Sequence, residues 1–258
     1  MKILGIIPAR MAATRFPNKP MALIEGMPMI GHCYFRSKMC GLLDEVYVAT
    51  CDKEIYEYIS SVGGKAIMTS NMHERATERS AEALLNVEKE IPDITYDIVV
   101  MIQGDEPLIN PLMINEVIEP LLTGKNEVSN LMARLKDLTE AENPNFVKVV
   151  TASNGRALYL SREPIPSPTK FKKEIEYFRQ LGLIAFTRES ILSYVKLPTT
   201  RLEIIESVDM NRFLENLVSI QMSVTDFEAD SVDTIEDLII VADKMKSDSL
   251  YSKYKINQ

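Results

Sequence analysis

The sequence predicts an α/β protein built on a mostly parallel sheet with helices on its faces. Short β-branched apolar runs alternate with amphipathic stretches over the first half of the chain, the order expected when parallel strands are joined by helices. Hydrophobic residues make up 46% and charged residues 26% of the 258, which is ordinary globular composition. After residue 127 strands follow one another with little helix between them. We therefore expect one domain over residues 1–258, with a smaller β-rich lobe around residues 145–190.

The first half of the chain is expected to contain four strands, with a helix after each. The helices have local start and stop signals, because Pro28 is tolerated in a first turn, Asp52 is a good N-cap and Gly63 can end a helix. The expected strands cover residues 2–7, 46–49, 65–68 and 97–102, and the helices cover residues 28–39, 52–62, 77–90 and 110–122.

The second half predicts an antiparallel extension and then a return to helices. Strands are expected over residues 127–135, 147–151, 158–161, 180–186 and 219–224, and helices over residues 190–195, 203–215 and 234–245. A proline-rich run at residues 164–168 and the basic residues 170–173 indicate an exposed excursion.

Composition excludes several classes of protein. With 29 basic and 37 acidic residues the net charge is −8, which argues against binding to nucleic acid or to an anionic membrane. Three cysteines are too few for a disulfide framework, and no apolar stretch approaches the length that crosses a bilayer. The short apolar start ends at Pro8 and does not match a signal peptide, so we expect a cytoplasmic protein.

Positive charge gathers in the loop after the first strand. Arg10, Arg15 and Lys19 lie within ten residues that hold no acidic residue, although the chain as a whole is acidic. The carboxyl end of a strand is where open α/β sheets bind ligands, and a triphosphate needs many cationic donors. The loop therefore predicts a triphosphate site, with a solvated basic loop as the alternative. The glycine-rich loops of dinucleotide and P-loop sites are missing from the sequence.

Two aspartates are candidate ligands of a magnesium ion. Asp105 follows the strongest predicted strand, a usual position for a carboxylate that holds Mg²⁺, but it could equally form a turn after Gly104. Asp233 precedes Thr234 and Asp237, whose spacing predicts a capping box for the last helix. That cap leaves the Asp233 side chain available, so it is either a second ligand or a surface residue.

The two histidines are weaker candidates. His32 falls on the apolar face of the first predicted helix and is expected to pack there, whereas His73 lies in a polar loop that it either orients or leaves exposed. Two histidines without a Ser-His-Asp arrangement give little support to nucleophilic hydrolysis.

An ordered set of short segments covers nearly the whole chain, namely residues 6–10, 14–17, 19–20, 26–30, 48–50, 68–69, 77–79, 103–107, 143–145, 147–150, 157–159, 161–162, 181–182, 232–234 and 236–238. Each segment is weak evidence alone, and their order makes the match specific. Taken together, they resemble one family, the 3-deoxy-manno-octulosonate (KDO) cytidylyltransferases, also called CMP-KDO synthetases.

The resemblance implies a GT-A-like, Rossmann-like nucleotidyltransferase that uses Mg²⁺ to join CTP to an acidic sugar with loss of pyrophosphate. It further implies a homodimer formed through the β-rich lobe and a place in lipopolysaccharide biosynthesis. The residues that match CTP-binding positions of the family are Ala9, Arg10, Lys19, Thr77, Arg79 and Gln103. The catalytic positions match Lys19, Arg10, Arg15, Asp105 and Asp233, of which the two aspartates match the metal pair.

The positions that face the acceptor in the family have changed in this chain. Arg15, Gln103 and Arg162 match acceptor-side residues. By contrast, Gln180 and Ile184 stand where the family usually has His and Tyr, and Asp209-Met210 replaces Glu-Gln. Residues 75–76 are Arg-Ala where Ser-Gly is usual. Fewer hydrogen-bonding groups imply a different acid, such as another ulosonate, a smaller carboxylate or a phosphonate, and the alternative is drift within a true KDO enzyme.

Two further classes stay open at this point. A sugar-1-phosphate nucleotidyltransferase would share the architecture, but such enzymes usually carry a glycine-rich first loop where this chain has Pro8-Ala9-Arg10. A catalytically silent binding protein on the same scaffold is the other possibility, although a purely structural role does not require two aspartates and three loop cations together.

Overall fold

The structure is a computed structural model that describes residues 1–12, 16–170 and 173–255. The chain forms two compact units, one made of residues 1–115 and 229–258 and the other of residues 116–228. The expected β-rich segment, residues 145–190, lies inside the second unit.

The first unit is built on four parallel strands, which confirms the predicted α/β class. They lie in the order β6 (Ile98–Met101), β1 (Ile3–Ala9), β4 (Glu45–Thr50) and β5 (Ala66–Met68). Gly5 of β1 lies opposite Val46 on one side and Val100 on the other. Every residue of β1 is buried, as expected for a central strand of a parallel sheet.

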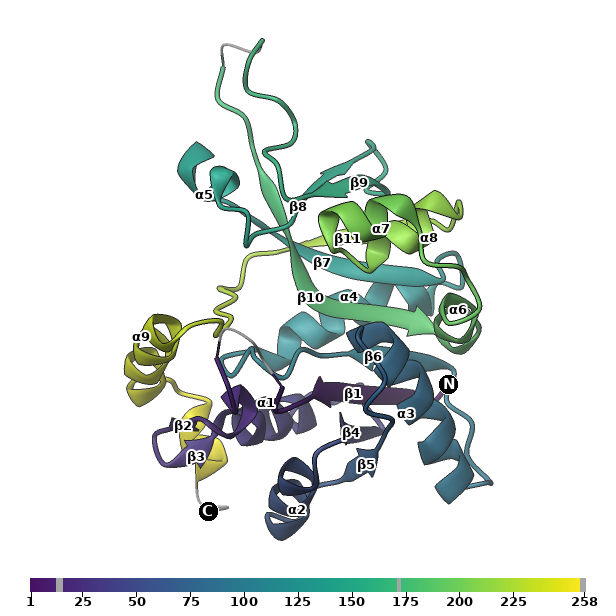
Figure 1. Cartoon of the computed structure of the whole chain (residues 1–258), viewed down its shortest axis with the longest axis vertical. Helices are drawn as coiled ribbons and strands as arrows, with labels where there is room; N and C mark the ends of the chain where they lie inside the picture. The colour runs from purple at the N-terminus through teal and green to yellow at the C-terminus, as the bar shows by residue number, and fades with distance from the viewer. Residues whose placement is uncertain (13–15, 171–172, 256–258) are drawn as a thin grey trace. The chain divides into compact units, whose positions relative to one another are not determined.

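Helices join these strands and cover the sheet (Figure 1). They are α1 (Met29–Lys38), α2 (Lys53–Ser61) and α3 (Ala76–Glu90), and α4 (Pro111–Leu122) follows β6. The chain moves from β1 to β4 to β5 in one direction and then returns to β6 on the far side of β1. Because such crossovers are right-handed, α1 and α2 cover one face of the sheet and α3 covers the other.

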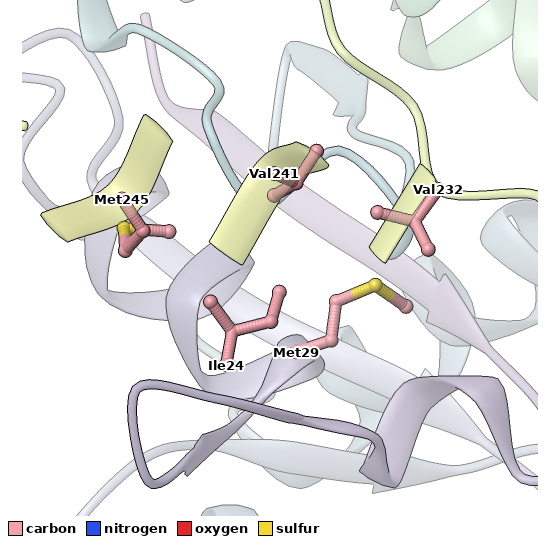
Figure 2. Packing of buried hydrophobic residues seen from close by; sticks show 5 residues of the cluster. All are labelled: Ile24, Met29, Val232, Val241 and Met245. Atoms are coloured by element: carbon pink, nitrogen blue, oxygen red, sulfur yellow. The ribbon is translucent and has the colours of Figure 1, made fainter. Parts of the chain in front are cut away.

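The last segment of the first unit packs against its beginning. Helix α9 (Ile235–Lys246) lies beside a small hairpin of β2 (Leu23–Ile24) and β3 (Met27–Pro28). Figure 2 shows the buried side chains that join them, which are Ile24, Met29, Val232, Val241 and Met245. This cluster holds Val232 against Ile24 and Met29, although about 200 residues of chain separate them.

The hairpin was not predicted. Its turn uses Glu25 and Gly26, whose φ angles are 48° and 85°. Two consecutive residues with positive φ form the tight turn that matches the twist of a two-stranded hairpin. The 3-10 helix η2 (Tyr251–Lys253) lies close to the end of the described residues of this unit.

The second unit has mixed strand pairing. Its strands are β7 (Val128–Arg134), β8 (Lys148–Thr151), β9 (Ala157–Ser161), β10 (Phe178–Thr187) and β11 (Ile220–Thr225). Strand β10 is antiparallel to β7 and β8, β8 is antiparallel to β9, and β11 is parallel to β7. The helices are α5 (Leu138–Glu142), α6 (Arg188–Tyr194), α7 (Arg201–Glu206) and α8 (Met210–Glu215).

The single helix predicted over residues 203–215 is wrong, because the chain forms α7 and α8 with a break at Ser207. Ser207 has a φ of 52° and ends α7. Arg162 holds this break through its side chain, whose Nε donates to the Glu206 carbonyl at 2.6 Å and whose Nη2 donates to the Ser207 carbonyl at 3.3 Å. A distant residue therefore satisfies the carbonyls at the helix end, which a local pattern does not reveal.

Asp52 stands at the N-cap of α2 as predicted, but its side chain does not cap the helix. The carboxylate instead accepts a hydrogen bond from the Met11 backbone N–H at 2.8 Å and so holds the loop that follows β1.

All three cysteines are free, with Cys33 and Cys40 buried. Within the described ranges, none of the helices combines the length and apolar character needed to cross a membrane.

Candidate active site

The first unit contains a cavity of about 370 Å³ beyond the carboxyl ends of β1 and β6. Its wall combines four cationic side chains with two aspartates. The lining residues are Pro8, Ala9, Arg10, Ala12, Phe16, Lys19, Pro20, His73, Glu74, Arg75, Ala76, Arg79, Gln103, Gly104, Asp105 and Asp233. This is the end of a parallel sheet where ligands are expected to bind.

Local backbone features bring the two main loops together. Asn18 adopts a left-handed conformation with a φ of 59°, and the 3-10 helix η1 (Lys19–Met21) follows with Pro20 buried. On the other loop, a Cβ on Gly104 would lie 3.0 Å from the Pro8 carbonyl oxygen and 3.1 Å from Ile30. Glycine at 104 therefore lets the loop of Asp105 approach the end of β1 closely.

The centre of the cavity is a cluster of one lysine and two aspartates. The Lys19 ammonium lies 2.7 Å from Asp105 Oδ2 and 3.4 Å from Asp233 Oδ1, and it donates to the Val232 carbonyl at 2.8 Å. The Lys19 side chain is only 13% exposed. Burial by itself lowers the pKa of Lys19, but the two carboxylates outweigh this effect and leave the pKa raised. Lys19 is therefore a cation at neutral pH.

The position of Asp233 is fixed by backbone hydrogen bonds. The Val232 N–H donates to the Asp105 carbonyl at 2.9 Å, which ties the two aspartate segments together. Asp237 Oδ2 accepts from the backbone N–H groups of Asp233 at 3.0 Å and Thr234 at 2.8 Å, while Thr234 Oγ1 accepts from the Asp237 N–H at 3.2 Å. The predicted capping box is thus confirmed, and it also holds the backbone of Asp233.

Arg79 lies in the cavity wall toward the start of α3. One of its nitrogens, Nη1, donates to Thr69 Oγ1 at 2.6 Å and to the Ser70 carbonyl at 3.1 Å. The other, Nη2, is buried and has no hydrogen-bond partner, and the residue is only 3% exposed. An unsatisfied buried donor is costly, so this nitrogen is suited to a ligand that supplies an acceptor.

His73 and Glu82 organise the loop before α3. His73 Nε2 is hydrogen-bonded to Glu82, and Glu82 Oε2 accepts from the Ser70 N–H at 2.9 Å. Burial raises the pKa of Glu82, but the hydrogen bonds from Ser70 and His73 outweigh it and leave the pKa lowered. The Arg10 guanidinium reaches the His73 carbonyl at 3.5 Å, which links the first loop to this one. Of the two roles considered for His73, the structure therefore supports loop orientation.

Most of the residues predicted for nucleotide and metal lie together. Ala9, Arg10, Lys19, Arg79, Gln103, Asp105 and Asp233 all line the cavity. Thr77 is not among the residues that line the cavity; it is fully buried, and its hydroxyl lies 4.0 Å from Met101 Sδ. Arg15 lies outside the described residues. Glu74 and Arg75 line the cavity without having been predicted, and so does His73, which was considered only for its loop. Their polar run before the Thr-Glu-Arg motif was a usable signal.

The predicted acceptor residues Arg162, Gln180, Ile184, Asp209 and Met210 all belong to the second unit. Besides its bonds at the helix break, Arg162 donates through Nη1 to the Pro144 carbonyl at 2.8 Å. Gln180 donates to Asn130 Oδ1 at 2.6 Å. Ile184 and Met210 are buried at 3% and 0% exposure, and Asp209 precedes α8. Their role toward an acceptor stays a prediction.

The sequence profile of a family described as cytidylyltransferase matches residues 4–222. Two curated relatives are named 3-deoxy-manno-octulosonate cytidylyltransferase. The one from Trichlorobacter lovleyi is 40% identical over 257 residues, covering 95% of this chain and 99% of the relative. The one from Fusobacterium nucleatum is 41% identical over 251 residues, covering 97% and 99%.

A solved structure shares the fold. It is described as CMP:2-keto-3-deoxy-manno-octonic acid synthetase complexed with CTP and superposes with a TM-score of 0.87 at 33% identity. The match covers 95% of this chain and 99% of the other.

Proposed function

The chain belongs to the cytidylyltransferase family, and on that premise we propose that it transfers CMP from CTP to 3-deoxy-manno-octulosonate, releasing pyrophosphate. The observation that carries this proposal is the convergence of Lys19, Asp105 and Asp233 in a cavity that also holds Arg10 and Arg79. This arrangement offers cationic donors for a triphosphate and carboxylates for a cation, which are the two requirements of nucleotidyl transfer.

In the proposed reaction a hydroxyl oxygen of the sugar acid attacks the α-phosphorus of CTP. The new bond joins that oxygen to the α-phosphorus, the bond from the α-phosphorus to the bridging oxygen breaks, and pyrophosphate leaves with the electron pair. Negative charge accumulates on the departing group, so the cationic side chains of Arg10 and Lys19 would stabilise it there. The hydroxyl proton is released to solvent or to a phosphate oxygen.

We propose Mg²⁺ as the cofactor. The fit rests on Lys19, because the carboxylates of Asp105 and Asp233 already converge on its ammonium and so place oxygen ligands around one positive charge. Two carboxylates completed by phosphate oxygens are the usual environment of Mg²⁺ in nucleotide enzymes. A magnesium ion there would polarise the α-phosphate and the attacking hydroxyl.

Arg79 supports the assignment of the base. The free Nη2 is a donor, and cytosine offers acceptors at its O2 and N3 positions. The loop that carries Thr69, Ser70 and His73 is tied down by hydrogen bonds, so this part of the cavity is preorganised.

The acceptor is tested by measuring pyrophosphate release with CTP, Mg²⁺ and a panel of acids. KDO is the expected substrate because both relatives are named for it at 40% identity or more. Turnover of another ulosonate, a carboxylate or a phosphonate but not KDO would instead agree with the changes at Gln180, Ile184, Asp209 and Met210. No turnover of any acid, combined with no binding of CTP, would refute the proposed class.

Variants of the two aspartates test the metal assignment. Asp105→Asn and Asp233→Asn should each lower kcat by at least ~10²-fold, because each removes an anionic ligand while keeping the side-chain volume. Asp243→Asn is the control, since that aspartate is 81% exposed and lies outside the cavity. Rates near that of the control in either variant would remove the metal assignment, provided that circular dichroism shows the fold intact.

We also propose a cytoplasmic homodimer. Three free cysteines agree with a reducing compartment. The dimer rests on the resemblance to the family, and the exposed Leu158, Ile204, Ile205 and Leu217 of the second unit are candidate contact residues. Light scattering of the purified protein measures the mass, and a monomer at all concentrations would refute the dimer.

A further inference from the structure

The Lys19 ammonium lies in the place that a cation shared by Asp105 and Asp233 requires. Its nitrogen contacts Asp105 at 2.7 Å and Asp233 at 3.4 Å, and it also binds the Val232 carbonyl at 2.8 Å. The side chain is only 13% exposed, so it is largely shielded from water. The two carboxylates are therefore neutralised in part by the chain itself.

The same oxygens cannot serve both cations fully. A divalent ion shared by the two carboxylates would lie next to the ammonium, and two positive charges at such a separation repel strongly in a half-buried site. Asp105 and Asp233 are themselves only 29% and 33% exposed, so water screens this repulsion incompletely. Metal entry thus requires Lys19 to move.

The cavity provides an alternative position for the ammonium. Lys19 lines the same cavity as Arg10 and Arg79, where the proposed triphosphate would bind. A lysine side chain has four rotatable bonds and carries its charge as a compact head, so it can exchange one set of acceptors for another. A triphosphate as a whole carries more negative charge than the two carboxylates together.

We propose that Lys19 is an exchangeable counter-ion that occupies the aspartate pair until a nucleoside triphosphate draws its ammonium away. The metal site is closed in the nucleotide-free protein and opens when the nucleotide binds. This inference rests on the proposed function and adds an order of binding to it. Linkage makes the effect reciprocal, so the metal ion strengthens triphosphate binding by the same factor.

The test is the binding of Mn²⁺ alone to the nucleotide-free protein, in which electron paramagnetic resonance measures the concentration of the unbound ion. Lys19→Met should bind Mn²⁺ at least about tenfold more tightly than wild type, because the carboxylates lose a charged hydrogen-bond partner and face no competing charge. Lys19→Arg keeps the charge and should bind as weakly as wild type. Lys19→Met combined with Asp233→Asn should lose the gain, which places the ion at the aspartate pair.

Separate controls cover the folding of the variants and the proposed function. Lys19→Gln is a second neutral variant whose amide can still donate to a carboxylate, and it should also gain affinity if Lys19→Met does not fold. If neither folded neutral variant binds Mn²⁺ more tightly than wild type, the counter-ion role is wrong. Pyrophosphate release by the wild-type protein tests the proposed function independently. Turnover by the wild type without tighter Mn²⁺ binding in the neutral variants would refute only the role of Lys19. Tighter Mn²⁺ binding in the neutral variants without turnover of any acid by the wild type would refute only the proposed function.

Discussion

Arg79→Lys tests whether the free guanidinium nitrogen in the cavity wall binds the nucleotide. In the structure, Nη1 of Arg79 is used twice by the loop before α3, while Nη2 is buried without a partner. Lysine keeps the positive charge but has a single donor head, so it cannot satisfy the loop and a ligand in the same fork geometry.

The size of the effect follows from the hydrogen bond to the nucleotide that lysine cannot make. One hydrogen bond that involves a charged group contributes about 1.5–3 kcal/mol. If Nη2 makes one such bond to the cytosine ring, Arg79→Lys should weaken CTP binding by roughly 10- to 150-fold. The effect should appear in the Kd for CTP and in KM, with a smaller change in kcat, because the base is remote from the reacting phosphorus.

Calorimetry with CTP measures the affinity, and Thr69→Val is the matched control. That variant removes the 2.6 Å bond from Arg79 Nη1 but leaves Nη2 and nearly the same side-chain volume. It should lower thermal stability while leaving CTP affinity close to wild type. If Thr69→Val weakens CTP binding as much as Arg79→Lys does, Arg79 acts through the loop. If Arg79→Lys binds CTP as tightly as wild type, the reasoning about Nη2 is refuted.

Two further predictions concern the second unit. Arg212→Met leaves the fully buried Glu203 without the guanidinium 2.6 Å away and should lower the free energy of unfolding by about 3–5 kcal/mol. Arg134→Met, whose ion pair is 54% and 67% exposed, should change it by less than about 1 kcal/mol in the same urea titration. If both variants lost the same free energy of unfolding, burial would not be what makes the Arg212 ion pair more important than the Arg134 ion pair. For Glu206, burial raises the pKa, but hydrogen bonds, the largest from the Arg162 N–H, hold it below the usual 4.5. The stability lost in Glu206→Gln should therefore be full above pH 4.5 and shrink as acid protonates the folded carboxyl. A loss that stays constant on acidification, measured by urea titration, would contradict this.

The strands of the first unit could be predicted because burial on both faces leaves a direct pattern in the sequence. β1 and β6 are uninterrupted apolar runs, and they lie next to each other in the sheet. The hairpin of β2 and β3 has only two residues in each strand, too few to show an alternation. The break at Ser207 depends on Arg162, which lies 45 residues earlier, so no local window contains its cause.

The cations and carboxylates of the site could be found one by one, but their pairing could not. Arg10 and Asp105 follow strands whose carboxyl ends meet at one edge of the sheet, so their proximity is a consequence of topology. Asp233 does not directly follow any of the four strands β6, β1, β4 and β5. It reaches the cavity because Val232 packs into the apolar cluster with Ile24 and Met29, a tertiary contact between distant segments (Figure 2).

The last motif has a structural role and a role in the candidate site at the same time. Thr234 and Asp237 form the capping box that starts α9, and the sequence left Asp233 as either a surface residue or a ligand. In the structure the carboxylate of Asp237 accepts the N–H of Asp233 as well as that of Thr234, so the cap itself fixes the backbone of Asp233. With the backbone held, the carboxylate of Asp233 lies 3.4 Å from the Lys19 ammonium. A motif that looks purely structural thereby supplies the rigidity that a charged site needs, since misplacing one carboxylate would weaken every contact to a shared cation.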